Sequence, residues 1–230
     1  MPKFNHLELL EFGAQILSAA GVPKEESNLV AGLLVKADLQ GYPGHGTNRI
    51  LSYVSRIETG LINLKQRHEI VREGKTTAVI NGNHYVGQVV AQDGMKLAIK
   101  KAREHGVGLV CLRQAAHVGR LADYMELAAN EGIIGMAAVS VGAGNIAPHG
   151  SMQAVTGTNP MAFGIPAADG NHIIFDFATA ATSMGELHNK VARGEAIPAG
   201  VMLDGHGNAT TAYESFIGPP RGVILSFGGY

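Results

Sequence analysis

The sequence predicts a mixed α/β (α+β) protein that opens with a helical segment. Over residues 5–60 the apolar side chains recur at the three- and four-residue spacing of amphipathic helices. From residue 68 onward, strand-like runs alternate with helical patterns, which is typical of a sheet joined to helices. A chain of 230 residues with 46% hydrophobic and 16% charged residues can bury a substantial core. We expect a helical segment at 1–75 and an α/β domain at 76–230.

Helix-start and helix-stop signals divide the N-terminal region. Asn5 is a suitable N-cap, and the helix that follows it should end at Gly21. Pro23 suits the first turn of a second helix, and a third helix is predicted over residues 47–58. The apolar face of the first helix contains Leu7, Leu10, Ala14 and Leu17, and that of the second contains Leu29, Val30, Leu33, Leu34 and Ala37.

The later elements follow from the same kinds of pattern. Residues 68–72 and 77–80 are predicted to form a short hairpin, and a helix over 86–105 should be closed by Gly106. The remaining predicted elements are a strand at 107–112, a helix at 119–131, strands at 133–141, 161–165 and 172–177, and a helix at 181–193.

Charge and hydropathy exclude several classes of protein. The net charge is −1 and lysine and arginine do not cluster, which argues against a nucleic-acid partner. The N-terminus has no basic region followed by an apolar stretch, and no apolar run approaches the roughly 20 residues that span a bilayer. We therefore expect a cytoplasmic protein with no membrane partner. The single cysteine, Cys111, cannot form an internal disulfide and is expected to be buried as a small hydrophobe.

The segment 117–120 contains the first candidate functional residue. His117 lies in a turn between the predicted strand 107–112 and the helix that follows it. Rigid elements on both sides hold a histidine at such a position while its ring remains available to a ligand. Because histidine transfers protons near neutral pH, His117 is a candidate acid–base residue. The alternative is a surface histidine at a helix start.

The glycine-rich segment 142–147 matches the dinucleotide fingerprint G-x-G-x-x-A. That motif works only when the third small residue opens a helix whose N-terminus meets the pyrophosphate. Here Pro148, His149 and Gly150 come next, no helical periodicity follows, and no acidic residue stands about 20 positions further on. The sequence therefore predicts no Rossmann fold, although a glycine loop can still approach a ligand.

A second candidate cluster precedes the third predicted helix. Arg49 and Tyr53 are four residues apart and so share a helix face, and His45 lies just before them. An arginine at this position can bind a carboxylate with two parallel hydrogen bonds, and a histidine can assist it. The alternative is a solvated helix face that follows a turn.

Two further segments place polar groups beside predicted strands. The turn at residues 156–160 supplies hydroxyl and amide groups, and residues 176–179 follow another strand with a carboxylate at its carboxyl end. Taken singly, each can be a structural turn or cap. No spacing of histidine, cysteine and acidic residues indicates a metal site.

Taken in order along the chain, these segments form a recognisable set. They are Gly44-His-Gly-x-x-Arg49 with Tyr53 and Gly60-Leu-Ile62, His117-x-Gly119 with Tyr124, Ala147-Pro148 with Gly150, Gly157-Thr-Asn-Pro160, and Asp176-Phe-Ala-Thr179. The set resembles the malate/L-lactate dehydrogenase family that lacks a Rossmann fold, which also includes ureidoglycolate dehydrogenase, sulfolactate dehydrogenase and cyclic imino acid reductases.

The resemblance implies a substrate-pocket segment at 1–75 and a non-Rossmann, mixed-sheet cofactor-binding domain at 76–230. It implies that His117 is the catalytic acid–base residue and that His45 and Arg49 line the substrate pocket, where we expect Tyr53 to join them. It also implies a homodimer and a nicotinamide cofactor, NAD or NADP. The residues implied to hold the cofactor are Ser140, Thr158, Asn159, Asp176, Phe177 and Ala178.

The expected function is hydride transfer between NAD(P) and a small 2-hydroxy or 2-oxo acid. This chain differs from the family in having Gly44 where a serine usually precedes the pocket histidine. Family members also continue past Tyr230 into a region that packs on the N-terminal helices, and without it the helices at 7–20 and 24–39 should lack part of their cover. The alternative function is a non-catalytic remnant that acts as a binding or interaction module.

Overall fold

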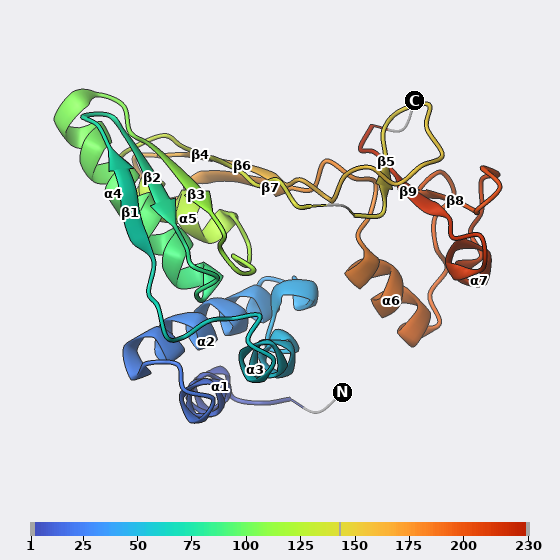
Figure 1. Ribbon diagram of the computed structural model, residues 1–230, viewed down its shortest axis with the longest axis horizontal. Helices are drawn as coiled ribbons and strands as arrows, with labels where there is room; N and C mark the ends of the chain where they lie inside the picture. Colours follow the sequence, from blue (N-terminus) through green and yellow to red (C-terminus); the bar gives the residue numbers. More distant parts are fainter. Residues whose placement is uncertain (1–2, 143, 229–230) are drawn as a thin grey trace. The chain divides into compact units, whose positions relative to one another are not determined.

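The computed structural model describes residues 3–142 and 144–228 and shows a mixed α/β fold (Figure 1). The chain forms two compact units. The first contains the residues up to Gly135 together with Gly164–Ile174, and the second contains Met136–Phe163 and the residues from Phe175 onward. In the part of the chain described, no helix combines the length and the apolar character needed to cross a membrane.

The N-terminal helices form where the sequence predicts them. They are α1 (His6–Ala19), α2 (Lys24–Leu39) and α3 (Arg49–Glu58). The Asn5 side chain accepts a hydrogen bond of 2.8 Å from the Leu7 N–H and so caps α1. The short 3₁₀ helix η1 (Pro43–His45), which precedes α3, was not predicted, and α3 begins two residues later than predicted.

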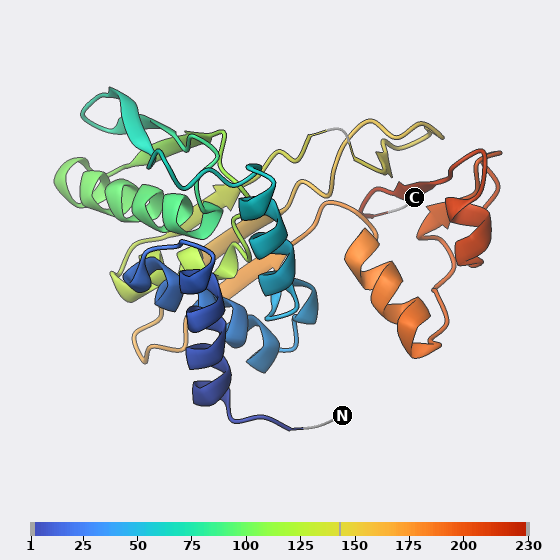
Figure 2. The same ribbon diagram turned by 60° about the horizontal axis from the view of Figure 1, so that its bottom comes forward.

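The first sheet has the strand order β1–β2–β3 and contains β1 (Glu69–Glu73), β2 (Thr77–Asn81) and β3 (Leu109–Arg113). Strands β1 and β2 are antiparallel, whereas β2 and β3 are parallel and are joined by α4 (Gly87–His105), which packs along the sheet (Figure 2). Gly106 ends α4 at a φ of 82°, in the left-handed region.

Cys111 is exposed, so the prediction that it is buried was wrong. The residue lies on β3, an edge strand of this sheet, where alternate side chains point in opposite directions. Leu109 and Cys111 share the exposed face and Leu112 points the other way, into the core. The apolar run at residues 107–112 therefore did not indicate that both faces of β3 are buried.

The core of the first unit joins the N-terminal helices to the first sheet. Leu17 of α1 and Leu34 of α2 belong to the same buried cluster as Ile80 of β2 and Val89 of α4. Because these elements bury their apolar faces together, the compact unit continues to Gly135.

The chain from residue 122 to 177 contains α5 (Ala122–Asn130) and a sheet with the strand order β4–β6–β7. Its strands are β4 (Gly135–Ala138), β6 (Met161–Ile165) and β7 (Ile173–Phe177), each within a segment predicted as a strand.

The second unit has its own small core. It contains α6 (Met184–Arg193), α7 (Tyr213–Ile217) and the short strands β5 (Ile146–Ala147), β8 (Met202–Leu203) and β9 (Val223–Leu225), in the order β5–β9–β8. Leu187, Met202, Phe216 and Ile224 are buried in this core. Of these elements only α6 was predicted from periodicity, because strands of two or three residues carry no periodic pattern.

The glycine-rich loop enters a strand. Ile146 and Ala147 form β5, which pairs in parallel with β9, and so no helix opens at Ala147. This confirms the rejection of the Rossmann reading of segment 142–147. Ala143 within that segment, and Tyr230 at the end of the chain, lie outside the described residues.

The first turn of α4 lies against the loop that carries His117. A Cβ atom at Gly87 would stand 2.2 Å from the Ala116 carbonyl oxygen and 2.3 Å from that of His117. Since both neighbours are backbone atoms, Gly87→Ala forces the loop or the helix to shift. We expect it to lower the free energy of unfolding by about 1–3 kcal/mol, as overpacking does, measured by urea denaturation followed by circular dichroism.

Gly32→Ala in α2 is the matched control. A Cβ atom at Gly32 meets only Leu10 Cδ1, at 3.8 Å, and alanine is the better helix former by about 0.5–1 kcal/mol. The control should therefore be as stable as the original chain or more stable. Equal stability of the Gly87→Ala and Gly32→Ala proteins would show that the loop at residues 116–117 yields without cost.

Candidate active site

His117 lies in the loop between β3 and α5, where backbone contacts fix its position. The Ala116 N–H donates to the Tyr85 carbonyl oxygen at 3.3 Å, just before α4 begins. Two residues after His117, Gly119 adopts a φ of 75°, a left-handed conformation that glycine takes without strain. The sequence prediction of a histidine held between a strand and a helix is thus confirmed.

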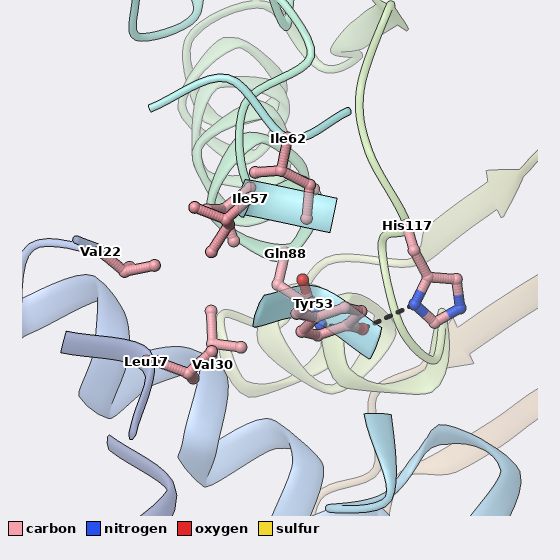
Figure 3. Close-up of a pocket in the computed structure, with 10 residues that line it drawn as sticks. Leu17, Val22, Val30, Tyr53, Ile57, Ile62, Gln88 and His117 are labelled. Atoms are coloured by element: carbon pink, nitrogen blue, oxygen red, sulfur yellow. Dashed lines mark hydrogen bonds between the residues drawn. The ribbon is translucent and has the colours of Figure 1, made fainter. Parts of the chain in front are cut away.

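The His117 ring is part of a chain of side-chain hydrogen bonds. The Tyr53 hydroxyl lies 2.7 Å from His117 Nδ1, and Gln88 Nε2 donates to the same hydroxyl at 2.7 Å (Figure 3). Tyr53 and Gln88 are 4% and 1% exposed, whereas His117 is half-buried. The helix α3, the start of α4 and the loop after β3 therefore meet at this imidazole.

His45 lies parallel to His117. The two rings stack with their centroids 5.3 Å apart and their planes 9° apart. Asp38 fixes the turn that follows His45, since its carboxylate accepts hydrogen bonds from the Thr47 N–H at 2.8 Å and the Thr47 hydroxyl at 2.6 Å. The turn at His45 is thereby tied to the end of α2.

Arg49 begins α3 beside this pair of rings. Its Nε donates to the Gly44 carbonyl oxygen at 2.6 Å, and its two terminal nitrogens make no hydrogen bond within residues 3–142 and 144–228. The structure thus brings His45, Arg49, Tyr53 and His117 together in one unit, as the sequence predicts. The Tyr53 hydroxyl is directed at His117.

The surroundings favour a neutral His117. Burial disfavours the imidazolium, and the positive electrostatic contributions of His45, Arg49 and Arg56 act in the same direction, so the pKa of His117 falls to about 3. Burial raises the pKa of Tyr53 to about 12, although the Gln88 hydrogen bond and the two arginines act against that rise. At neutral pH both partners of the Tyr53–His117 hydrogen bond are therefore uncharged.

The apolar side of the site explains the effect of burial. Tyr53, Gln88 and His117 line one pocket together with apolar side chains from α1, α2, α3 and the segments next to them (Figure 3). These apolar side chains are Leu17, Val22, Val30, Ile57 and Ile62. In such surroundings water solvates a charge poorly.

Gln88 is the member of this site that sequence reasoning missed. It stands between Gly87 and Val89 in the first turn of a helix whose neighbouring side chains are buried. A polar residue in the buried first turn of a helix was the only available signal, and it does not identify a partner. Gln88 and Tyr53 are 35 positions apart.

Arg120, three residues after His117, is 6% exposed. Its Nη2 donates to Asp123 Oδ1 at 2.7 Å, and its guanidinium carbon lies 5.3 Å from the centre of the Tyr42 ring. Lys36 adds a second ion pair to Asp123, at 3.1 Å. This network ties the start of α5, just after His117, to α2.

The residues predicted to bind the cofactor lie in the second unit, on neighbouring backbone segments. Asn159 Oδ1 accepts from the Val141 N–H at 2.9 Å, and Thr179 donates to the Thr158 carbonyl oxygen at 2.9 Å through its N–H. These bonds bring the segment of Ser140, the turn of Thr158 and Asn159, and the segment of Asp176, Phe177 and Ala178 to one place.

The donor set of this second cluster fits a nicotinamide nucleotide in its chemistry. Ser140 and Thr158 carry hydroxyls, Asp176 carries a carboxylate that suits a sugar hydroxyl, and the Phe177 ring is 38% exposed beside the Phe227 ring. Gly157, next to Thr158, serves chain packing, because a Cβ atom there would meet Val141 Cβ at 2.6 Å. Within the described residues, no group of three or more histidine, cysteine or acidic side chains is placed to hold a metal ion.

Comparisons with known proteins identify one family. The family model described as malate/L-lactate dehydrogenase matches residues 4–230. The L-sulfolactate dehydrogenase of Methanothermobacter thermautotrophicus is 40% identical over 216 residues, which are 94% of this chain and 62% of the relative. The malate dehydrogenase of Pyrococcus horikoshii is 37% identical over 222 residues, 96% of this chain and 61% of the relative.

Solved structures show the same fold. The malate dehydrogenase of Entamoeba histolytica matches with a TM-score of 0.93 and 31% identity, and covers 99% of this chain and 64% of its own. The sulfolactate dehydrogenase of Methanocaldococcus jannaschii matches with a TM-score of 0.87 and 35% identity, and the match covers 98% and 64%. The chain thus spans somewhat less than two thirds of the length of these relatives. By sequence and by fold, the chain belongs to the malate/L-lactate dehydrogenase family.

Proposed function

We propose that this chain carries the substrate-binding and cofactor-binding parts of an NAD- or NADP-dependent 2-hydroxy acid dehydrogenase. The observation that carries the proposal is a neutral, half-buried histidine, His117, which lies beside His45 and Arg49. The relatives named above are dehydrogenases of malate and sulfolactate, which supports a small hydroxy acid as the substrate class.

In the proposed reaction Arg49 holds the substrate carboxylate. Its terminal nitrogens present a planar pair of donors that matches a carboxylate, and this contact orients the neighbouring carbinol carbon. His45 borders the same space through its stacked ring. His117 accepts the hydroxyl proton during oxidation and returns a proton during reduction of the 2-oxo acid.

The nicotinamide, when bound, accepts or supplies the hydride. We assign its binding to Ser140, Thr158, Asn159, Asp176, Phe177 and Ala178, whose chemistry fits a nucleotide. We further propose that the protein is a homodimer that acts in the cytoplasm on a freely diffusing acid and has no nucleic-acid or membrane partner.

The proposed function is tested by offering the chain a panel of 2-oxo acids and monitoring turnover as loss of the absorbance of NADH or NADPH. If no acid is turned over and calorimetry detects no binding of either cofactor, the chain is a non-catalytic binding module instead.

Replacement of the proton-transfer residue should slow the reaction. We expect His117→Ala to lower kcat by about 10²–10⁴-fold, the usual contribution of a positioned acid–base group. Calorimetric titration with NADH should give nearly the same affinity, because His117 is assigned to the substrate. Retention of the original kcat would exclude His117 as the acid–base residue.

Replacement of the carboxylate ligand should weaken substrate binding. Arg49→Lys keeps the positive charge but loses the planar pair of donors, so KM should rise about tenfold, as expected for the loss of one charge-assisted hydrogen bond. The measurement is the initial rate against the concentration of the 2-oxo acid. Arg72→Lys, on the exposed strand β1, is the control and should leave KM unchanged. An equal KM for both variants would show that Arg49 does not bind the substrate and belongs to a solvated face of α3.

A further inference from the structure

We propose that Gln88, Tyr53 and His117 form a proton relay that keeps the neutral His117 ring protonated on Nε2. This inference rests on the proposed function and adds a positioning residue, Gln88, and a proton source, Tyr53, to it. The relay makes the unbonded side of the imidazole a donor toward the substrate oxygen.

The hydrogen bonds of the Tyr53 hydroxyl determine which nitrogen of His117 carries the hydrogen. The Gln88 side-chain nitrogen can only donate, so at 2.7 Å the Tyr53 oxygen is its acceptor. The Tyr53 hydroxyl hydrogen then needs an acceptor of its own, because a buried donor without a partner costs about 1–3 kcal/mol. His117 Nδ1 stands 2.7 Å away and can accept it. In that arrangement Nδ1 carries no hydrogen, and the neutral ring carries its hydrogen on Nε2.

The second ring nitrogen of His117 is available to a substrate. Nε2 lies on the side of the ring away from Tyr53 (Figure 3), and it makes no hydrogen bond within the part of the chain that the structure describes. A carbonyl or hydroxyl oxygen of a substrate can take that position. His117 would then meet a 2-oxo acid as an N–H donor.

The groups around His117 determine the charge of its ring. The groups that face His117 are His45 from η1 and Arg49, Tyr53 and Arg56 from α3, with the Gln88 amide behind Tyr53. Burial and these positive charges hold the pKa of His117 at about 3, so imidazolium is scarce near neutral pH. A neutral ring that gives up its only N–H hydrogen needs a replacement at Nδ1, and the Tyr53 hydroxyl is the group in place to supply it.

The proton transfers balance. In reduction, the carbonyl carbon takes the hydride of the reduced nicotinamide and its oxygen takes the proton from His117 Nε2. The Tyr53 O–H bond breaks as the Nδ1–H bond forms, so His117 remains neutral throughout. The negative charge moves to the Tyr53 oxygen, where the Gln88 N–H and the positive charges of Arg49 and Arg56 stabilise it. After the product leaves, water protonates Nε2 and Nδ1 returns its proton to the Tyr53 oxygen, which restores the Nε2–H ring. Oxidation of the 2-hydroxy acid follows the same steps in reverse.

The tautomer can be measured on the chain without substrate or cofactor. Long-range ¹H–¹⁵N spectra of ¹⁵N-histidine-labelled protein distinguish Nε2–H from Nδ1–H rings, and the signals absent from His117→Asn identify His117. We expect the original chain to show the neutral Nε2–H ring from about pH 6 to 9. An Nδ1–H ring, or an imidazolium at about pH 6, would overturn the relay.

Gln88→Glu should reverse the direction of the two hydrogen bonds that link residue 88, Tyr53 and His117. A carboxylate at residue 88 accepts the Tyr53 hydrogen, so the Tyr53 oxygen can only accept from His117 and the ring should change to Nδ1–H. Gln92→Glu, one turn further along α4, adds the same charge outside the hydrogen-bonded chain and should leave the ring as Nε2–H. Retention of the Nε2–H ring in Gln88→Glu up to about pH 9 would contradict the relay.

A pH profile separates the relay from a purely structural role of Tyr53. In the original chain, the rate at which a saturating 2-oxo acid is reduced should be independent of His117 ionisation between about pH 6 and 9. In Tyr53→Phe the ring must donate from the imidazolium, so this rate should fall about tenfold per pH unit over that range. Tyr85→Phe, which loses another buried hydroxyl, should keep the original profile. A Tyr53→Phe profile parallel to the original would exclude Tyr53 as a proton source. Absence of both turnover and cofactor binding in the original chain would refute the proposed function. The spectra would still decide, independently of activity, whether Gln88 sets the tautomer.

Discussion

The hydrogen bond between Tyr53 and His117 Nδ1 is the interaction on which the first unit's site depends. It joins residues 64 positions apart, on α3 and on the loop after β3. The bond forms because Gly87 lets the first turn of α4 approach the backbone of His117, while the core formed by α1, α2 and α4 holds Tyr53 in place. The geometry of the catalytic candidate is therefore a consequence of core packing.

Burial and charge act together on this bond. Apolar side chains from the N-terminal helices disfavour any ion at Tyr53 or His117, and the arginines of α3 oppose an imidazolium while favouring a tyrosinate. The result is a histidine that stays neutral near pH 7 and is oriented by a phenol. The same arginines make the region attractive to the carboxylate of a small acid.

The division of the chain into two units separates two groups of candidate site residues. The first unit contains the candidate acid–base residue and the candidate carboxylate ligand, and the second contains the hydroxyl, carboxylate and aromatic groups assigned to the nucleotide. Each unit has its own buried cluster, so each group of side chains is supported by its own core. The boundary falls after α5, well beyond the helical segment, because β2 and α4 bury their apolar faces against α1 and α2.

Local sequence patterns determined the helices α1 to α6, the strands β1 to β4, β6 and β7 to within a few residues, and the absence of a helix after the glycine-rich loop. Periodicity, caps and turn residues act over a few positions, so they can be recognised without knowledge of the fold. The sequence also identified His45, Arg49, Tyr53 and His117 as candidates, because their residue types and order carry the family resemblance. Tertiary structure alone decided that Gln88 bonds Tyr53, that Tyr53 bonds His117 and that Cys111 is exposed. Those facts depend on which buried surfaces meet across many positions of sequence, and the free energy of that packing is not encoded in any single segment.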